Sequence, residues 1–266
     1  MRRDFIKYIY SGIFSISFFL CLKIAIPSPA ESIDTRDSEI IKKYQKIILE
    51  EPSNLNAHFN LGILYYRNAL FDEAVREFRK VLDINPNDSE AYYNLGNVFN
   101  KKNLFGDAID SYKKATAINP RDAEIFHNLG NAYAGKGMID DAISSYKKAI
   151  EINPNLAESH KSIAYLYKKK GQTTESIQSF EKAAKSNSKD IPMLLDLAST
   201  YESNGSQDRA ILTYKRILSI DPNHKDTKNR LAMLCNNKGV SLALQGKRDE
   251  AISVCIQRSL TKQRRL

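Results

Sequence analysis

Few side chains in this sequence have the type and spacing that catalysis or metal binding requires. The four histidines, His58, His127, His160 and His224, lie far apart, and none has a second ligand at the spacing of a metal site. There is no glycine-rich phosphate loop or nucleophile elbow. The three cysteines match no zinc pattern and are too few for a disulfide framework. We therefore expect no catalytic residue, no bound metal and no cofactor, in a protein that is not an enzyme.

Asparagine is the polar residue whose spacing does suggest a binding chemistry. Asn60, Asn94 and Asn128 are 34 residues apart, and Asn97 and Asn131 are separated by the same interval. A side-chain amide offers both a donor and an acceptor, so a row of amides can hydrogen-bond the backbone of an extended peptide whatever its sequence. The alternative is that asparagine is simply a usual residue at these repeated positions.

The net charge of +9 is confined to the two ends of the chain. Residues 1–23 carry +3 and residues 225–266 carry +7, while residues 24–224 carry −1. A general nucleic-acid binder needs cations along its body, because each phosphate contact uses one. We therefore expect no nucleic-acid partner. The basic C-terminal end is interpreted as a solvated helix end, with contact to anionic lipid or RNA as the alternative.

Residues 1–30 have the composition of a targeting segment. A basic start precedes an apolar run from Tyr8 to Leu22, which is short for a membrane-spanning helix of about 20 residues. Residues 2–7 (Arg-Arg-Asp-Phe-Ile-Lys) resemble the twin-arginine export signal. The alternatives are an ordinary secretory signal or an uncleaved anchor. We expect an exported protein in the periplasm or on the outer face of a prokaryotic inner membrane, touching the membrane only through this segment if it stays uncleaved.

The rest of the chain repeats one pattern every 34 residues. Within each interval a small residue is followed twelve residues later by another, and an aromatic residue follows four positions beyond that. Apolar residues at helical spacing fill both halves of the interval. Prolines mark the interval at Pro52, Pro86, Pro120, Pro154 and Pro222. A short turn separates the halves at Ala69, Asn103, Gly137, Gly171 and Gly205.

Two antiparallel helices in each interval account for this pattern. Glycine and asparagine tolerate the left-handed conformation that ends a helix, and proline ends the second helix because it cannot continue the hydrogen-bond ladder. We expect the small pair to let the helices approach closely and the aromatic side chain to fill the wider space beyond. The period, the Leu-Gly pair, the small residue, the aromatic and the proline together resemble the tetratricopeptide repeat from Glu39 to about Leu260.

The resemblance implies an all-α fold, a right-handed α-solenoid of antiparallel helix pairs with about six repeats and an N-terminal capping helix. In the last unit Gly239 lies 41 residues after Ala198. Because seven extra residues make about two helical turns, one long helix is predicted from Asp226 to about Ala243. The expected divisions are a signal peptide or anchor at 1–30, a linker and capping helix at 31–54, repeats at 55–88, 89–122, 123–156, 157–190 and 191–224, and a degenerate sixth repeat with a basic end at 225–266.

The repeat pattern suggests a role for two pairs of side chains. His58 and His160 occupy the position that holds an aromatic residue in other repeats, so we interpret both as helix-packing histidines. Cys235 and Cys255 fall opposite each other in the last unit. Two small buried thiols are the preferred interpretation, and a disulfide is the alternative.

The resemblance also implies that the first helix of each repeat lines a concave groove that binds another protein. The expected function is a non-enzymatic interaction scaffold or assembly factor of the cell envelope, which holds an extended or helical segment of its partner. A self-associating structural organiser at a membrane surface is the alternative. The residues expected to bind the partner in the groove are Phe59, Asn60, Tyr66, Arg67, Tyr93, Asn94, Asn97, Asn100, Lys101, His127, Asn128, Asn131, Lys161, Tyr165 and Lys168.

Overall fold

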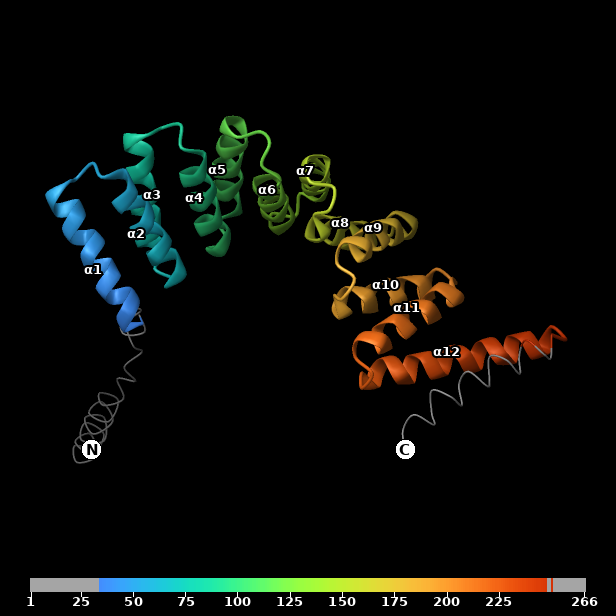
Figure 1. Cartoon of the computed structure of the whole chain (residues 1–266). Coiled ribbons are helices and arrows are strands. Elements are labelled where there is room, and N and C mark those ends of the chain that lie inside the picture. The colour runs from blue at the N-terminus through green and yellow to red at the C-terminus, as the bar shows by residue number, and fades with distance from the viewer. Residues whose placement is uncertain (1–33, 248–249, 251–266) are drawn as a thin grey trace, which may run out of the picture. The chain divides into compact units, whose positions relative to one another are not determined.

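The computed structural model describes residues 34–247 and residue 250, and this part of the chain is helical without strands. The expected all-α array of helix pairs is confirmed (Figure 1). The targeting segment, Cys255 and the end of the sixth repeat lie outside the described residues. The helices are α1 (Thr35–Glu50), α2 (Leu55–Arg67), α3 (Phe71–Ile84), α4 (Ser89–Lys101), α5 (Phe105–Ile118), α6 (Ala123–Gly135), α7 (Ile139–Ile152), α8 (Ala157–Lys169), α9 (Thr173–Ser186), α10 (Ile191–Ser203), α11 (Gln207–Ile220) and α12 (Lys225–Leu244).

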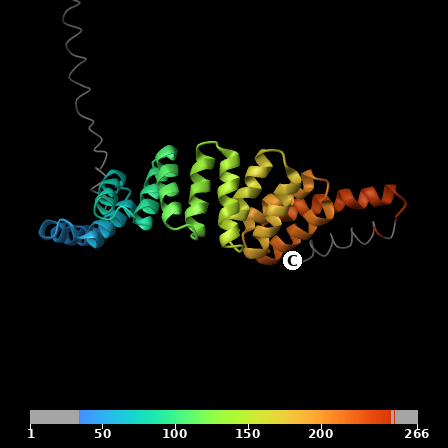
Figure 2. The same ribbon diagram turned by 90° about the horizontal axis from the view of Figure 1, so that it is seen from above.

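The first and second helices of a repeat pack against each other along their length. This pairing joins α2 with α3, α6 with α7, α8 with α9, and α10 with α11, and Figures 1 and 2 show the pairs side by side. The single helix α1 packs on α2 through Ile41 and Tyr44, as expected of a capping helix. The chain divides within α4, after Val98, into two compact units.

The turn inside each repeat has one residue with positive φ, at each of the five positions that the sequence indicates. Gly137, Gly171 and Gly205 have φ of 82°, 73° and 74°, and Ala69 and Asn103 each have φ of 58°. This conformation is the left-handed one that ends a helix. It crowds a Cβ atom, so Ala69 is held there by its surroundings at a cost in energy.

The turns between repeats satisfy the backbone at the start of the next helix. The side chain of Asn54 accepts a hydrogen bond from the amide of Ala57 at 2.9 Å, and Asp190 accepts one from the amide of Met193 at 3.0 Å. An Asn or Asp at this position offers the free N–H groups of the first turn an acceptor. These caps fix where α2 and α10 begin, whereas α8 begins after Leu156 without a side-chain cap.

Gly62 and Gly130 of the first helices make room for an aromatic ring. A Cβ atom at Gly62 would lie 2.8 Å from the ring of Phe78, and one at Gly130 would lie 2.6 Å from the ring of Tyr146. A side chain at either position would therefore meet the aromatic ring. Phe78 is fully buried, so the glycine and the ring form one packing unit at the centre of the repeat.

The long helix expected near the C-terminus is present as α12 (Lys225–Leu244). Leu231, Leu234 and Cys235 are buried on it, whereas Val240 and Leu244 are exposed near its end. Because Cys255 lies outside the described residues, the interpretation of the two thiols stays a prediction. Among the described residues, no helix is long and apolar enough to cross a membrane.

Candidate functional site

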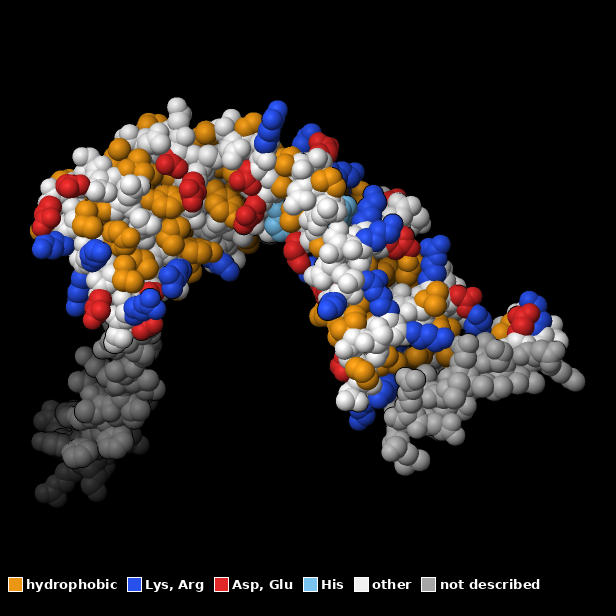
Figure 3. Space-filling model, in the orientation of Figure 1, with side chains coloured by type: hydrophobic (Ala, Val, Ile, Leu, Met, Phe, Trp, Pro, Cys, Tyr) orange, Lys and Arg blue, Asp and Glu red, His pale blue; other side chains and the backbone are white. Residues whose placement is uncertain are grey.

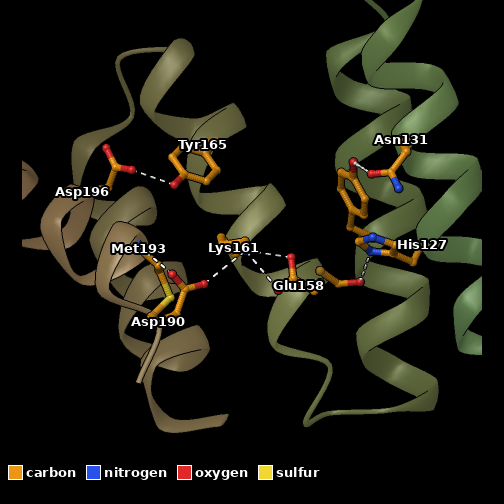
Figure 4. Close-up of polar contacts among 10 residues, drawn as sticks. His127, Asn131, Glu158, Lys161, Tyr165, Asp190, Met193 and Asp196 are labelled. Carbon is orange, nitrogen blue, oxygen red and sulfur yellow. Dashed lines mark hydrogen bonds and ion pairs between the residues drawn. The ribbon is translucent and has the colours of Figure 1, made fainter. Parts of the chain in front are cut away.

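The candidate site is the surface that the first helices of successive repeats form within each unit, called here the first-helix face. In the second unit its helices α6, α8 and α10 are joined by side-chain hydrogen bonds, and Figure 4 shows the side chains that make them. Six of the expected binding residues come from α6 and α8: His127, Asn128, Asn131, Lys161, Tyr165 and Lys168.

The α6 part of the face is a chain of hydrogen bonds built around Tyr146. The Tyr146 hydroxyl donates to Oδ1 of Asn131 at 2.7 Å, and Nδ2 of Asn131 donates to Oδ1 of Asn128 at 3.1 Å. The ring of His127 lies 5.3 Å from the ring of Tyr146. Burial raises the pKa of Tyr146 to about 12, so its hydroxyl stays protonated and remains a donor at neutral pH. The Asn131 amide is therefore already engaged within the protein.

His127 also contacts a serine of the next repeat, but this pair is not arranged for nucleophilic catalysis. Nδ1 of His127 lies 2.8 Å from Oγ of Ser159, and burial lowers the pKa of His127. Ser159 is 0% exposed, so its hydroxyl cannot reach a bound carbonyl. Across the described part of the chain, no group of three or more His, Cys, Asp or Glu residues is placed to hold a metal ion.

Lys161 is held by two carboxylates, one on its own helix and one at the N-cap of the next first helix, α10. Its Nζ lies 2.8 Å from Glu158 and 3.2 Å from Asp190. Burial alone would lower the pKa of Lys161, but the hydrogen bonds and negative charges of Glu158 and Asp190 outweigh it and raise that pKa. Lys161 therefore stays charged, and Glu158 and Asp190 neutralise its charge within the face.

Tyr165 and Lys168 share one carboxylate on the next first helix. The Tyr165 hydroxyl donates to Oδ2 of Asp196 at 2.7 Å, and Nζ of Lys168 donates to Oδ1 at 3.2 Å. Burial, and then the hydrogen bond to Asp196, raise the pKa of Tyr165. The Tyr165 ring packs edge-on against Phe180, with 5.1 Å between the ring centroids, yet the residue remains 38% exposed. Tyr165 is therefore an exposed aromatic side chain on this part of the face.

In the first unit the expected residues make mainly aromatic contacts and contacts within their own helix. The ring of Phe59 lies 5.8 Å from that of Phe78. Nδ2 of Asn60 and Nδ2 of Asn94 donate to the carbonyls four residues earlier, at 2.8 Å and 2.9 Å. Figure 3 shows hydrophobic side chains gathered on the surface over α1 to α4, with Lys and Arg below them, and Lys and Arg between hydrophobic side chains over α8 to α11.

The remaining expected residues are placed as follows. The Tyr66 ring lies 6.1 Å from that of Phe71, and Arg67 is exposed, with a guanidinium nitrogen 3.7 Å from Asp37. On α4, Tyr93, Asn97 and Asn100 are partly buried and Lys101 is exposed.

Sequence reasoning missed two carboxylates that complete the face, Asp190 and Asp196. Their partners lie 28 to 31 residues away along the chain. The long separations are slightly less than one repeat, because side chains of neighbouring first helices meet at staggered positions. A search for opposite charges at that separation would have found them.

The repeats of this chain match a known family of proteins. The family model described as the cilia and flagella-associated protein 70 C-terminal domain, a tetratricopeptide-repeat domain, matches residues 31–253. No curated protein matches the chain.

Several solved structures are similar to it. A crystal structure of MamA is 30% identical, covering 57% of this chain and 89% of that chain with a TM-score of 0.55. Another MamA structure is 26% identical, covering 65% and 94% with a TM-score of 0.59. YrrB, described as a tetratricopeptide-repeat protein with an unusual peptide-binding site, is 20% identical, covers 70% and 96% with a TM-score of 0.57, and shows the fold alone.

Proposed function

The chain belongs to the family of the cilia and flagella-associated protein 70 C-terminal domain, a tetratricopeptide-repeat domain, and we propose that it is a non-enzymatic scaffold that holds a segment of another protein on its first-helix face. Repeat domains of this kind form protein–protein interaction surfaces. The proposal also specifies which face binds, that the partner segment is extended or helical, and in which compartment the protein acts.

The observation that carries the proposal is the set of hydrogen bonds that link α6 to α8 and α8 to α10 or its N-cap. His127, Lys161 and Tyr165 are each fixed by a hydrogen bond to the next first helix or its N-cap. Side chains fixed before binding lose little conformational freedom when a partner arrives, which favours affinity. An extended or helical segment lying across the three helices would contact the exposed part of the Tyr165 ring.

The polar contacts offered to the partner differ from a simple row of free amides. The Asn131 amide is bonded to Tyr146 and Asn128, so a partner must compete for it. In Asn60 and Asn94 one side-chain N–H donates to the carbonyl four residues earlier, and the amide has a second N–H and an oxygen. We therefore propose that these two asparagines can both donate to and accept from the backbone of the partner. The peptide-binding site described for YrrB supports peptide binding as one use of this fold.

The proposed compartment is the cell envelope of a prokaryote, after export. Its support is the sequence of residues 1–30, with Arg2 and Arg3 ahead of an apolar run and with Ser28 and Ala30 after it. This segment lies outside the described residues.

A photo-cross-linking amino acid at position 165 tests the binding face. With the variant produced in cells, a partner should be cross-linked at position 165 and identified by mass spectrometry. The same amino acid at Lys148, which is exposed on the second helix α7, serves as the control and should capture nothing specific. Capture at 148 with none at 165 would move the site to the second helices.

Self-association is the second candidate, because α12 exposes three apolar side chains, Met233, Val240 and Leu244. Sedimentation analysis over a range of concentrations tests it. Assembly that the change Leu244→Lys abolishes would favour this candidate, and a monomer at every concentration would exclude it.

A further inference from the structure

Asn204 and Gly205 form the only Asn-Gly pair in the sequence. They lie in the turn between α10 and α11, and both residues are exposed to solvent. In such a pair the backbone nitrogen of the glycine can attack the side-chain carbonyl of the asparagine, because glycine has no Cβ atom to hinder the approach and its backbone angles are little restricted. The pair therefore has the chemistry for deamidation, a reaction that needs no enzyme.

The folded turn keeps the two reacting atoms apart. Ring closure requires the Gly205 nitrogen to eclipse the Cβ atom of Asn204, but ψ of Asn204 is 3°, at which the Gly205 nitrogen eclipses the backbone nitrogen of Asn204 instead. The Gly205 N–H also donates to the carbonyl oxygen of Glu202 at 3.0 Å. Because a reaction needs its two atoms in contact and aligned, the turn must open before Asn204 can react.

The Asn204 side chain adds little to this protection. Its Nδ2 lies 3.4 Å from Oγ of Ser206, which is longer than an ordinary N–H···O hydrogen bond. Once the turn is open, rotation of the side chain toward the Gly205 nitrogen therefore costs little. The backbone of the turn is what limits the reaction.

The first repeat contains a matched asparagine whose side chain is held firmly. Asn68 occupies the same turn position four repeats before Asn204, with φ of −90° and ψ of 14° against −86° and 3° for Asn204. Its Nδ2 donates to Asp37 at 2.9 Å and to the carbonyl oxygen of Leu64 at 2.8 Å. The residue that follows it is Ala69, whose Cβ atom hinders attack by its nitrogen. Asn68 is therefore an internal control with the same backbone geometry.

We propose that Asn204 is a site of spontaneous deamidation, and that opening of the α10–α11 turn controls the reaction. In the open turn a bond forms between the Gly205 nitrogen and Cγ of Asn204, the Cγ–Nδ2 bond breaks, and ammonia leaves with the proton of the Gly205 N–H. Water then adds to one of the two carbonyls of the resulting cyclic imide. Opening of the ring at Cγ gives aspartate, and opening at the backbone carbonyl gives isoaspartate, in which the main chain runs through Cγ.

Both products disfavour closing of the turn. A carboxylate at residue 204 lies beside the last carbonyl groups of α10, where the helix dipole is unfavourable to negative charge. Isoaspartate also adds one carbon atom to the main chain, which displaces the Gly205 N–H from its acceptor. The change falls on the helix that carries Asp196, the carboxylate that positions Tyr165 and Lys168. Deamidation thus loosens the first-helix face with time, whatever partner binds there.

Peptide mapping by mass spectrometry tests the site, with the purified full chain stored at physiological pH and temperature. Aspartate and isoaspartate should accumulate at residue 204, while Asn68 stays unchanged. The same chain unfolded in guanidinium chloride should react faster at Asn204. The ratio of the unfolded to the folded rate should equal the protection of the Gly205 amide against hydrogen exchange, because both processes require that N–H to leave its hydrogen bond.

Two outcomes would overturn the proposal. If Asn204 reacts as fast in the folded chain as in the unfolded chain, the turn does not control the reaction. If Asn68 in the folded chain reacts as fast as Asn204, the Asn-Gly pair is not a distinct site.

Hydrogen exchange of the stored chain tests the consequence. The isoaspartate form, separated by ion exchange, should lose protection at the Gly205 and Ser206 amides. The change Asn204→Asp is the control for charge alone and should keep most of that protection, because its main chain has the ordinary length. The change Asn204→Gln, which disfavours the ring by lengthening the side chain, should abolish the loss on storage. An isoaspartate form as well protected as the parent would contradict the loosening.

Discussion

The hydroxyl of Tyr165 and the carboxylate of Asp196 are joined by a hydrogen bond of 2.7 Å, although 31 residues separate them along the chain. The contact links the first helices of two successive repeats, and Lys168 donates to the other oxygen of the same carboxylate. Asp196 is thus the point at which an exposed aromatic ring and a cation of one repeat are positioned by the next.

The change Asp196→Asn should lower the pKa of Tyr165, because it removes the negative charge beside the hydroxyl; burial would still keep that pKa above its ordinary value. Titration of the tyrosine Cζ signals by NMR, assigned with Tyr165→Phe, measures the shift. The change Asp140→Asn is the control, since Asp140 is paired with Lys170 and not with Tyr165. A Tyr165 that titrates alike in both variants would contradict the shared carboxylate.

The change Gly130→Ala should destabilise the second unit by about 1–3 kcal/mol through overpacking. The new Cβ atom would lie 2.6 Å from the Tyr146 ring, which is buried and tied to Asn131. Urea unfolding measures the loss. The matched control is Gly106→Ala in α5, where a Cβ atom meets nothing within 4 Å. There alanine should raise the free energy of unfolding by about 0.5–1 kcal/mol, because glycine is the poorer helix former. Equal stability of the two variants would argue against the glycine–ring contact.

Replacing Ala69 by glycine should stabilise the first unit. An L-residue in the left-handed conformation costs about 1–2 kcal/mol, and the greater freedom of glycine in the unfolded chain offsets about 0.4–1 kcal/mol of the gain. The net increase in the free energy of unfolding should be about 0.5–1 kcal/mol. The reverse change, Gly137→Ala, should lower it by a similar amount, because Gly137 has φ of 82°. Chemical denaturation of both variants checks the opposite signs.

His127 should make the second unit less stable in acid. Burial lowers its pKa in the folded chain, so as the pH falls below ~6.5 the unfolded chain binds a proton before the folded chain does. Stability should therefore decrease from pH 7.5 to pH 5.5, and His127→Phe should reduce that decrease. Unfolding curves of the parent and the variant at the two pH values measure this effect. The same pH dependence in both proteins would contradict the role of His127.

Export can be tested through the paired arginines. If the twin-arginine route is used, changing Arg2 and Arg3 to Lys should retain the protein inside the cell, as measured by fractionation. Normal export of this variant would exclude that route and leave an ordinary secretory signal. An uncleaved chain in the membrane fraction would instead favour the anchor.

The fold was predictable because its determinants repeat within short segments. The positive φ at Asn103 follows from a turn between two helical patterns, and the length of α12 follows from seven extra residues that preserve the helical phase. The contact between Gly62 and Phe78 was harder to predict from the sequence. The sequence indicates that small and aromatic residues pack together, but the side-chain direction decides which of them lies against the glycine.

The candidate site was predictable only in its location. The helices that carry Lys161 and Lys168 follow from the period, but the carboxylates that neutralise them depend on the stagger between neighbouring repeats, which a 34-residue pattern does not reveal. Likewise, nothing in the sequence around Asn131 indicates that its amide is occupied by Tyr146. Binding by the expected residues stays a prediction.

In the second unit, hydrogen bonds join each of α6 and α8 to the first helix that follows or to its N-cap, over separations of 28 to 32 residues. A pulling force applied along this part of the chain would load these interfaces in series, so the weakest would open first while the others kept their structure. Each repeat of 34 residues that unfolded would release about 110–120 Å of extended chain, at about 3.3–3.6 Å per residue. The unit should therefore lengthen in steps of one repeat, as a mechanical element that yields gradually.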